Sequence, residues 1–257
     1  MRNVRGRKRE STRLAVPLLL GLGSLGLFAL VWRRRAAPRT DRDTRRGGSE
    51  HPIADAARPA LPAAVAAAPD TQLAPTGSGP LFHRRYDVLI SGSTFSAAAL
   101  LRLMQRHLSE LAPSALAHFE KSQGSEGLAR VGDEYDITLL GPWNGRVRVV
   151  ESTARHFTLV TLDGHPEAGH ISFSVAPVAD SNDTLQVLIE SWARARDAIV
   201  AVAYGTLGVG KQVQTEVWIT FLQRLSALAG VAQTPEVRIR TEALAAIDAP
   251  PGPRRDA

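Results

Sequence analysis

Five runs of alternating apolar and polar residues constrain the fold of this chain more than any other feature. Apolar residues at every second position indicate strands that bury one face. Gly, Pro, Asp and Asn separate the runs, so we expect consecutive antiparallel strands joined by tight turns. The predicted strands cover residues 134–140, 146–153, 156–162, 170–178 and 185–194.

Segments whose apolar residues have the spacing of a helix lie before and after these strands. A strand is predicted over 83–90, a helix over about 93–111 and a short second helix over 113–121. A long amphipathic helix comes last, and Gly230 is its expected C-cap. One face of that helix is apolar and holds Val213, Val217, Trp218, Phe221, Leu222, Leu225 and Leu228.

This order of elements is that of the START-like, or helix-grip, fold. We therefore expect an α+β domain over residues 81–232, in which a curved antiparallel sheet wraps a long C-terminal helix. Ligand sites in proteins are usually concave and largely apolar, and such a fold offers that space between helix and sheet. The inward faces of the strands are therefore the first place to look for chemistry.

An uncharged apolar segment of 19 residues runs from Leu14 to Trp32. At about 1.5 Å per residue, a helix of this length nearly spans a hydrocarbon core of ~30 Å. We predict a single-pass transmembrane helix; the alternative is a cleaved signal peptide, but Arg33 follows with no small-residue cleavage site. Six basic residues precede the segment and seven follow it, so the positive-inside rule is nearly balanced, and we expect a cytoplasmic domain.

The basic excess of the chain is confined to its N-terminal end. Residues 1–46 hold 13 of the 31 Lys and Arg, and the remainder carries a net charge of −4. The folded domain therefore lacks the positive charge that phosphate-backbone binding needs, and we expect no nucleic-acid partner. Residues 1–13 form a basic tail, 33–80 a disordered linker that is first Arg-rich and then Ala/Pro-rich, and 233–257 a second tail.

A resemblance to a known family supports this fold. Trp143 to Val150, the stretch Thr161 to Gly169 of the form TLxGHPExG, Phe173 and Val175 resemble an uncharacterised bacterial and plant family. That family belongs to the START-like, polyketide-cyclase-like superfamily. The resemblance covers about residues 81–230 and implies the helix-grip fold, but it implies no reaction.

His165 and Glu167 are the candidate catalytic residues. A turn that carries an imidazole two residues from a carboxylate could supply a general acid and base near neutral pH. A structural role is the alternative, because Gly164, Pro166 and Gly169 are residues that a tight turn uses, and both side chains can bond the turn's own backbone. The sequence favours the structural role.

The candidate ligand-binding residues lie on the predicted strands or next to them. Glu190, Trp192 and Arg194 share one strand face; if it lined a cavity, Arg194 could pair with Glu190 or hold an anionic group, and otherwise the three form a surface set. No His-x-x-x-His or His-x-His pair is present, so no metal site is predicted, and no cofactor is expected. Cysteine is absent, which excludes thiol chemistry. The remaining candidates are Trp143, Thr161 and Phe173.

Three functions are compatible with these features. The first is a membrane-tethered START-like domain that binds a hydrophobic small molecule or lipid in an internal cavity. The second is a cyclase or hydrolase that uses His165 and Glu167 as acid and base, and the third is an interaction module without a ligand. The sequence favours binding over catalysis, and it leaves the oligomeric state open.

Overall fold

The computed structural model describes residues 39–45, 61–139, 144–179, 181, 183–201, 209–231 and 233–244. The chain divides into two compact units, Met1–Ala36 and Ala37–Ala257, and every described residue belongs to the second. The predicted transmembrane segment from Leu14 to Trp32 and the candidate Trp143 lie outside the described residues. Within the described ranges, no helix is both long and apolar enough to cross a membrane.

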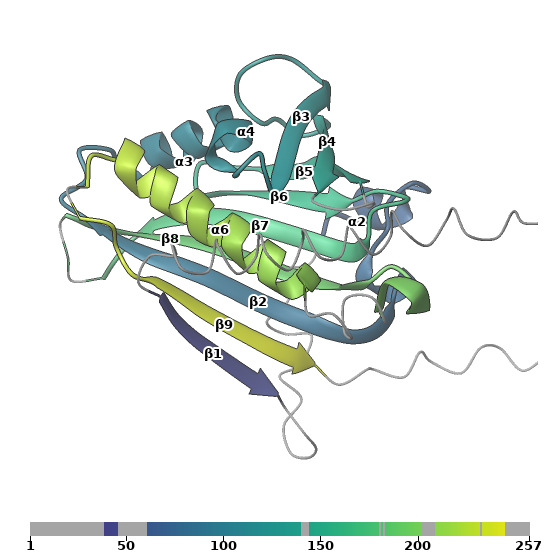
Figure 1. Cartoon of the computed structure of the whole chain (residues 1–257). Coiled ribbons are helices and arrows are strands. Elements are labelled where there is room, and N and C mark those ends of the chain that lie inside the picture. Colours follow the sequence, from purple (N-terminus) through teal and green to yellow (C-terminus); the bar gives the residue numbers. More distant parts are fainter. Residues whose placement is uncertain are drawn as a thin grey trace, which may run out of the picture. The chain divides into compact units, whose positions relative to one another are not determined.

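One curved sheet of nine strands organises the second unit (Figure 1). The strand order is β1-β9-β2-β8-β7-β6-β5-β4-β3, and every neighbouring pair is antiparallel except the parallel pair β1 and β9. The strands are β1 (Arg39–Arg45), β2 (Ser78–Ser91), β3 (Ala117–Gln123), β4 (Glu134–Leu139), β5 (Asn144–Ser152), β6 (His156–Thr161), β7 (Glu167–Pro177), β8 (Thr184–Ala195) and β9 (Val237–Leu244). The prediction of an α+β domain with a curved antiparallel sheet is confirmed, and β4 to β8 are the five predicted strands.

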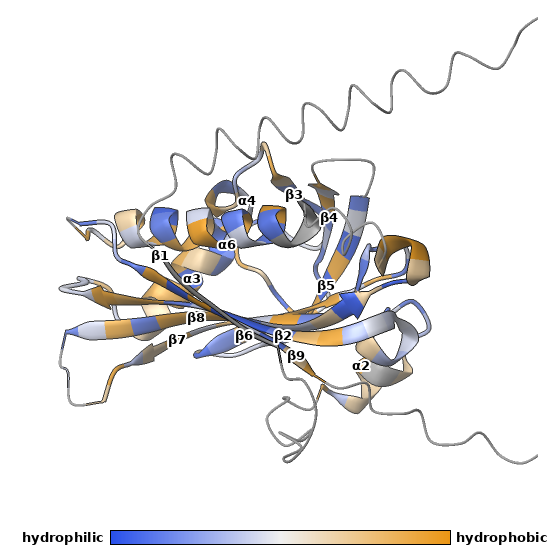
Figure 2. Ribbon diagram, turned by 60° about the horizontal axis from the view of Figure 1, so that its bottom comes forward, coloured by the Kyte–Doolittle hydropathy of each residue, from blue (hydrophilic) through white to orange (hydrophobic). Residues whose placement is uncertain are grey.

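Helices lie on both faces of this sheet (Figure 2). The helices α3 (Ala97–Arg106), α4 (Leu108–Leu111) and α6 (Val209–Leu228) lie on one face, and α2 (Ala63–Ala67) lies on the other. Ser96 caps α3, because its hydroxyl accepts from the Ala99 backbone N–H at 3.3 Å. Gly230 follows α6 with a φ of 82°, which confirms the expected C-cap.

An aromatic cluster joins α6 to the sheet. The Phe173 ring is fully buried; it stacks on Phe157 at 4.6 Å between centroids and meets Trp218 edge-on at 5.5 Å. Phe221 lies 5.8 Å from both Phe173 and Trp218. Such pairs contribute about 0.5–1.5 kcal/mol each beyond the area that they bury. The face of the sheet that carries Phe173 is therefore the core face.

The second predicted helix, over 113–121, is wrong. Its residues from 117 onward form β3 instead, in which Ala117 and Phe119 are buried while His118 and Glu120 are exposed. Phe119 lies opposite Ile137 of β4 and also contacts Trp218, at 6.4 Å between ring centroids. Pro113 favours the start of a helix, but a strand lets alternate side chains be buried and places Phe119 on the core face of the sheet. This tertiary packing decides the structure of the segment.

Residues 61–77 are folded onto the sheet, although they fall within the predicted linker. This segment, which we call the strap, contains α2 and a single 3-10 turn, η2 (Ala74–Thr76). Its few apolar side chains are spaced so that they meet the sheet face opposite α6. There Leu61, Val65 and Leu73 pack against Val150, Val160 and Leu162.

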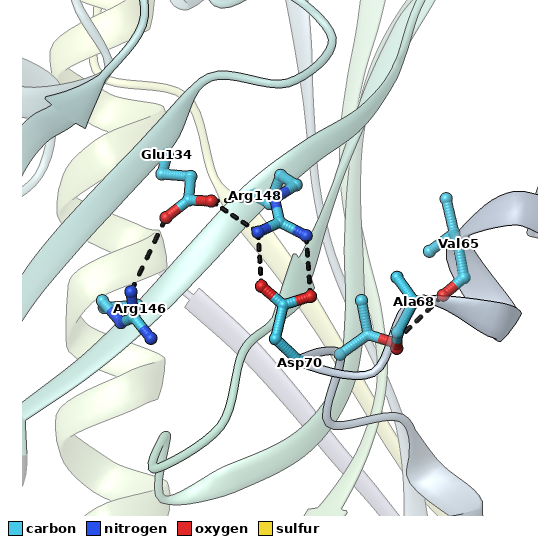
Figure 3. Close-up of polar contacts among 7 residues, drawn as sticks. Val65, Ala68, Asp70, Glu134, Arg146 and Arg148 are labelled. Atoms are coloured by element: carbon cyan, nitrogen blue, oxygen red, sulfur yellow. Dashed lines mark hydrogen bonds and ion pairs between the residues drawn. The ribbon is translucent and has the colours of Figure 1, made fainter.

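An ion-pair network fixes the strap to the sheet (Figure 3). The Arg148 guanidinium on β5 donates to both carboxylate oxygens of Asp70, at 3.0 and 2.5 Å. The same guanidinium donates from Nε to Glu134 Oε1 at 2.9 Å, and Arg146 Nη1 lies 3.7 Å from Glu134 Oε2. A bidentate pair specifies orientation as well as attraction, so the strap is held in one register on β5.

Two further strands lie in segments predicted to be unstructured. Residues 237–244 of the predicted tail form β9, which pairs with β2, and residues 39–45 of the predicted linker form β1 at the sheet edge. Val237 and Ile239 are buried, and Ile239 lies opposite Tyr86. The alternation of apolar and polar residues in VRIRT (237–241) indicated this strand. The prolines that follow it favoured the prediction of a disordered tail instead.

The Asp70–Arg148 pair should make the stability of the domain depend on acid pH. Hydrogen bonding to Arg148 lowers the pKa of Asp70 below its ordinary value of 3.8. A carboxylate with a lowered folded-state pKa stabilises above its unfolded pKa, and this is lost as pH falls through the folded value. We expect Asp70→Asn to lower the urea midpoint at pH 7, with the difference from wild type shrinking as the pH falls below 3.8 and through the lowered folded-state pKa. The matched control is Asp136→Asn, an exposed carboxylate on β4; an equal effect there would contradict the assignment.

Candidate functional site

Polar residues continue the apolar faces of four elements on the core side of the sheet. In β2, Arg84 lies on the same strand face as the buried residues Tyr86, Val88 and Ile90. In β7, Glu167 lies on the same strand face as Phe173. Ser191 continues the buried face of β8, and Gln214 lies one helical turn before Trp218 on α6. We call Arg84, Glu167, Ser191, Gln214 and Trp218 the polar cluster.

Direct contacts join three members of the polar cluster, Arg84, Glu167 and Gln214, across the sheet and the helix. Arg84 Nη1 lies 3.2 Å from Glu167 Oε1, and the two side chains are only 6% and 12% exposed. Gln214 Nε2 donates to the other Glu167 oxygen at 3.1 Å. Ser191 lies opposite Arg84 in the β2–β8 register. The Glu167 carboxylate is thus held between a cation on β2 and an amide on α6.

Several polar atoms of the cluster are buried without a partner. Arg84 Nε, Ser191 Oγ, Gln214 Oε1 and Trp218 Nε1 have no hydrogen-bond partner among the described residues. Arg84, Ser191 and Trp218 are 5%, 2% and 6% exposed. Buried polar atoms are normally paired, and each one left unpaired costs roughly 1–3 kcal/mol. Two N–H donors, one hydroxyl and one carbonyl acceptor are therefore available to a molecule that reaches them.

The His165 imidazole serves the turn between β6 and β7. Its Nδ1 lies 3.0 Å from the Glu167 backbone nitrogen and 3.0 Å from the Glu167 carbonyl oxygen, so this ring nitrogen bonds the backbone of the turn in either tautomer. Burial lowers the pKa of His165 below its ordinary value of 6.5, against the opposing attraction of Glu167. A buried ring whose Nδ1 is occupied by the backbone of its own turn is a weak general base. The Glu167 carboxylate is bound by Arg84 and Gln214, not by this ring.

Gly145 on β5 makes room for the His165 ring. A Cβ added at Gly145 would lie 2.1 Å from His165 Cδ2 and 2.9 Å from Nε2. The backbone of Gly145 does not have a positive φ, so close approach and not turn geometry explains the glycine. His165 is thus held by its own turn on one side and by a neighbouring strand on the other.

Two of the expected ligand-binding residues have structural partners. The Thr161 hydroxyl donates to the Gln72 carbonyl at 2.7 Å and accepts from the Gly169 N–H at 2.9 Å. Phe173 is the centre of the aromatic cluster described above. Thr161 therefore joins the strap to the β6–β7 hairpin, and Phe173 packs α6 on the sheet.

The trio Glu190, Trp192 and Arg194 lies on the sheet face opposite α6. The Glu190 carboxylate is bound by His83 Nε2 at 2.8 Å and lies 3.5 Å from Arg85 Nε, so its partners are not Arg194. The Trp192 ring, 2% exposed, is stacked between His83 and His170 at 4.8 and 5.0 Å. It packs against Ala74 of the strap, Leu81 and Leu244. Trp192 therefore faces neither the core nor water; it anchors the strap.

The residues that sequence reasoning missed are Arg84, Gln214 and the strap residue Gln72. Their signal was present, because Arg84 and Gln214 interrupt apolar positions of β2 and α6, where a charge or an amide is unexpected. Gln72 gave no such signal within an Ala/Pro-rich stretch. Among the described residues, no three His, Asp or Glu side chains are grouped to hold a metal ion.

Comparisons with known proteins give a family. The family described as "Domain of unknown function (DUF1990)" matches residues 92–227. This range includes Glu167, Ser191, Gln214 and Trp218, while Arg84 and the strap precede it. No curated protein matches the chain in sequence.

Solved structures with some similarity come from several organisms. A conserved protein from Geobacillus kaustophilus is 14% identical with a TM-score of 0.41, covering 60% of this chain and 98% of its own. A protein from Thermobifida fusca is 14% identical with a TM-score of 0.40, covering 57% and 94%. Norcoclaurine synthase from Thalictrum flavum, in complex with dopamine and hydroxybenzaldehyde, is 13% identical with a TM-score of 0.36, covering 54% and 87%.

Gly145→Ala should destabilise the domain through the His165 ring. The added methyl group overlaps a ring that is held by its turn, so we expect the free energy of unfolding to fall by about 1–3 kcal/mol in denaturant titrations. The Gly145→Ala, His165→Ala double variant should lose less than the sum of the two single variants. Strict additivity would show that the two positions are not in contact.

His165 should also make stability fall as the solution becomes mildly acidic. Because the folded-state pKa of His165 lies below 6.5, the unfolded state binds the proton first. The contribution of the neutral ring to the free energy of unfolding is therefore fully present above about pH 6.5. Below that pH it decreases, by up to about 1.4 kcal/mol per pH unit for one proton. Unfolding free energies of wild type and His165→Gln between pH 7.5 and 5.5 measure this, and the variant should show the smaller slope. Equal slopes would mean that the ring is protonated equally in both states.

Proposed function

This chain belongs to the DUF1990 family, a domain family of unknown function, and from that premise we propose that its site binds a small molecule between α6 and the sheet. The observation that carries the proposal is the set of unpartnered buried atoms on Arg84, Ser191, Gln214 and Trp218. A ligand oxygen would supply the missing partners. The position of α6 across a curved antiparallel sheet supports a START-like helix-grip fold, in which this is the ligand space.

The polar cluster and its surroundings describe the ligand. Donors and an acceptor are both unpartnered, so a hydroxyl group, which donates and accepts, fits them best. The aromatic cluster of Phe157, Phe173 and Phe221 adjoins Trp218, which favours an apolar body. We therefore propose a hydrophobic small molecule, such as a lipid or isoprenoid, that carries a hydroxyl or carbonyl oxygen. Tethering by Leu14 to Trp32 would place the domain beside its source of such molecules.

The catalytic alternative has less support from the geometry. The Nδ1 atom of His165 is occupied by the Glu167 backbone, and the Glu167 carboxylate is held by Arg84 and Gln214. An acid and base pair needs both groups free to reach a substrate. The proposed role of Glu167 is accordingly to hold Arg84 and Gln214 in position in the ligand site.

Ser191→Ala tests the proposed site. We would purify the full chain in detergent, release it into the gas phase and record bound farnesol by native mass spectrometry. Loss of one hydrogen bond should weaken farnesol binding by roughly three- to tenfold. Removing an unpartnered hydroxyl should leave the ligand-free protein as stable as wild type or more so. The matched control is Ser226→Ala, since the buried Ser226 hydroxyl already donates to the Leu222 carbonyl at 2.7 Å.

Farnesene provides the second control, because it has the apolar chain of farnesol without the oxygen. Wild type should prefer farnesol by about tenfold, and Ser191→Ala should reduce that preference. Wild type that carries no co-purifying molecule and binds neither probe would contradict the proposal and favour an interaction module. Equal binding of both probes would place the ligand away from the polar cluster.

A further inference from the structure

The strap pairs with the hairpin that carries Glu167. The Gln72 backbone N–H donates to the Thr161 carbonyl at 2.8 Å, and its carbonyl accepts from the Gly169 N–H at 2.9 Å. Two residues before Gln72, the Asp70 carbonyl accepts from the Asp163 N–H at 3.0 Å. The strap thus bridges the two arms of the β6–β7 hairpin next to its turn.

The Gln72 side chain then binds the turn itself. Its Nε2 donates to the His165 carbonyl at 2.7 Å and to the Glu167 carbonyl at 2.8 Å. Its Oε1 accepts from the Gly164 N–H at 3.2 Å. Both donors of the amide are therefore used, and one acceptor position is filled. One side chain from outside the hairpin thus ties together backbone groups at three residues of the turn.

Glu167 is consequently fixed by its backbone from two directions. Gln72 donates to its carbonyl, and His165 Nδ1 lies 3.0 Å from both its backbone nitrogen and its carbonyl oxygen. With both backbone groups fixed, the Glu167 side chain leaves the turn in one direction, toward Arg84 and Gln214. A shift of the turn would move the carboxylate away from both partners.

We propose that Gln72 is a positioning residue for the ligand site, which sets the Glu167 carboxylate against Arg84 and Gln214 through the backbone of the turn. This inference rests on the proposed ligand site but predicts an effect that needs no ligand. The Asp70–Arg148 pair holds Gln72 in register on the sheet, and Asp70 is the residue two positions before it. Asp70, Gln72 and Arg84, which precede the matched family range, therefore complete a site whose other members, Glu167, Ser191, Gln214 and Trp218, lie inside it.

Gln72→Met is the first test, because methionine keeps the size of glutamine and removes its hydrogen bonds. The ligand-independent readout is the side-chain amide resonance of Gln214 in 15N-labelled full chain, since that amide donates to Glu167. We expect this resonance to shift toward the value of a solvent-exposed glutamine amide. Farnesol binding, by native mass spectrometry, should weaken roughly three- to tenfold, as for the loss of one hydrogen bond.

Thr76→Ala is the matched control within the strap. The Thr76 hydroxyl donates to the Leu73 carbonyl at 2.8 Å, within the strap itself. It should leave both the Gln214 resonance and farnesol binding as in wild type. Asp70→Asn is the second variant, in case Gln72→Met fails to fold; by loosening the strap it should move the Gln214 resonance in the same direction by less.

The outcomes separate this inference from the proposed function. An unchanged Gln214 resonance in folded Gln72→Met, judged by near-ultraviolet circular dichroism, would overturn the positioning role whatever farnesol does. A shifted Gln214 resonance in a chain whose wild type binds no farnesol would support the positioning of Glu167 while contradicting the ligand proposal. A Thr76→Ala effect equal to that of Gln72→Met would overturn the inference, since any damage to the strap would then suffice.

Discussion

The contact between Phe173 and Trp218 is the interaction on which the rest of the structure depends. It joins the central strand β7 to α6, which is the last helix before the closing strand β9. Phe119 reaches the same indole from β3, at the far edge of the sheet. Because β3 and β7 are separated by β4, β5 and β6, the sheet has to curve for both phenylalanines to meet one helix.

That curvature leaves one end of α6 over polar side chains. Toward its N-terminal end, the aromatic contacts give way to Gln214, which meets Glu167, and Glu167 meets Arg84. A buried ion pair is weak support for stability, because desolvation offsets much of the attraction and apolar residues of equal size often stabilise more. A chain that keeps Arg84, Glu167 and unpartnered donors on apolar positions gains little in stability, so the polar cluster calls for a functional explanation.

The sequence predicts the features that depend on neighbouring residues in the chain, and it fails for those that depend on contacts between distant segments. Alternation predicted β4 to β8 because one buried face imposes it on each strand separately. The prediction of a helix around Phe119 failed because Pro113 gives a local helix signal. The burial of Phe119 against Ile137 and Trp218, which favours the strand, is a tertiary effect. The Gly and Pro spacing favoured a turn role for His165, and in the structure its ring bonds the backbone of that turn. Arg84 and Gln214 stood out as polar residues at apolar positions, but that they meet at Glu167 is a tertiary effect, and Gln72 needed the path of the strap, which a single sequence does not provide.

The charge of the polar cluster also limits what it can bind. Arg84 and Glu167 neutralise each other, and His165, the nearby titratable ring, has a pKa lowered by burial and is neutral at pH 7. A carboxylate or phosphate entering this site would leave one uncompensated negative charge in a buried place, which is costly unless it is paired. A neutral oxygen carries no such cost and still fills the hydrogen bonds of Arg84 Nε and Trp218 Nε1. The electrostatics therefore point to an uncharged head group on an apolar molecule, and they separate this site from the basic clefts that bind anions.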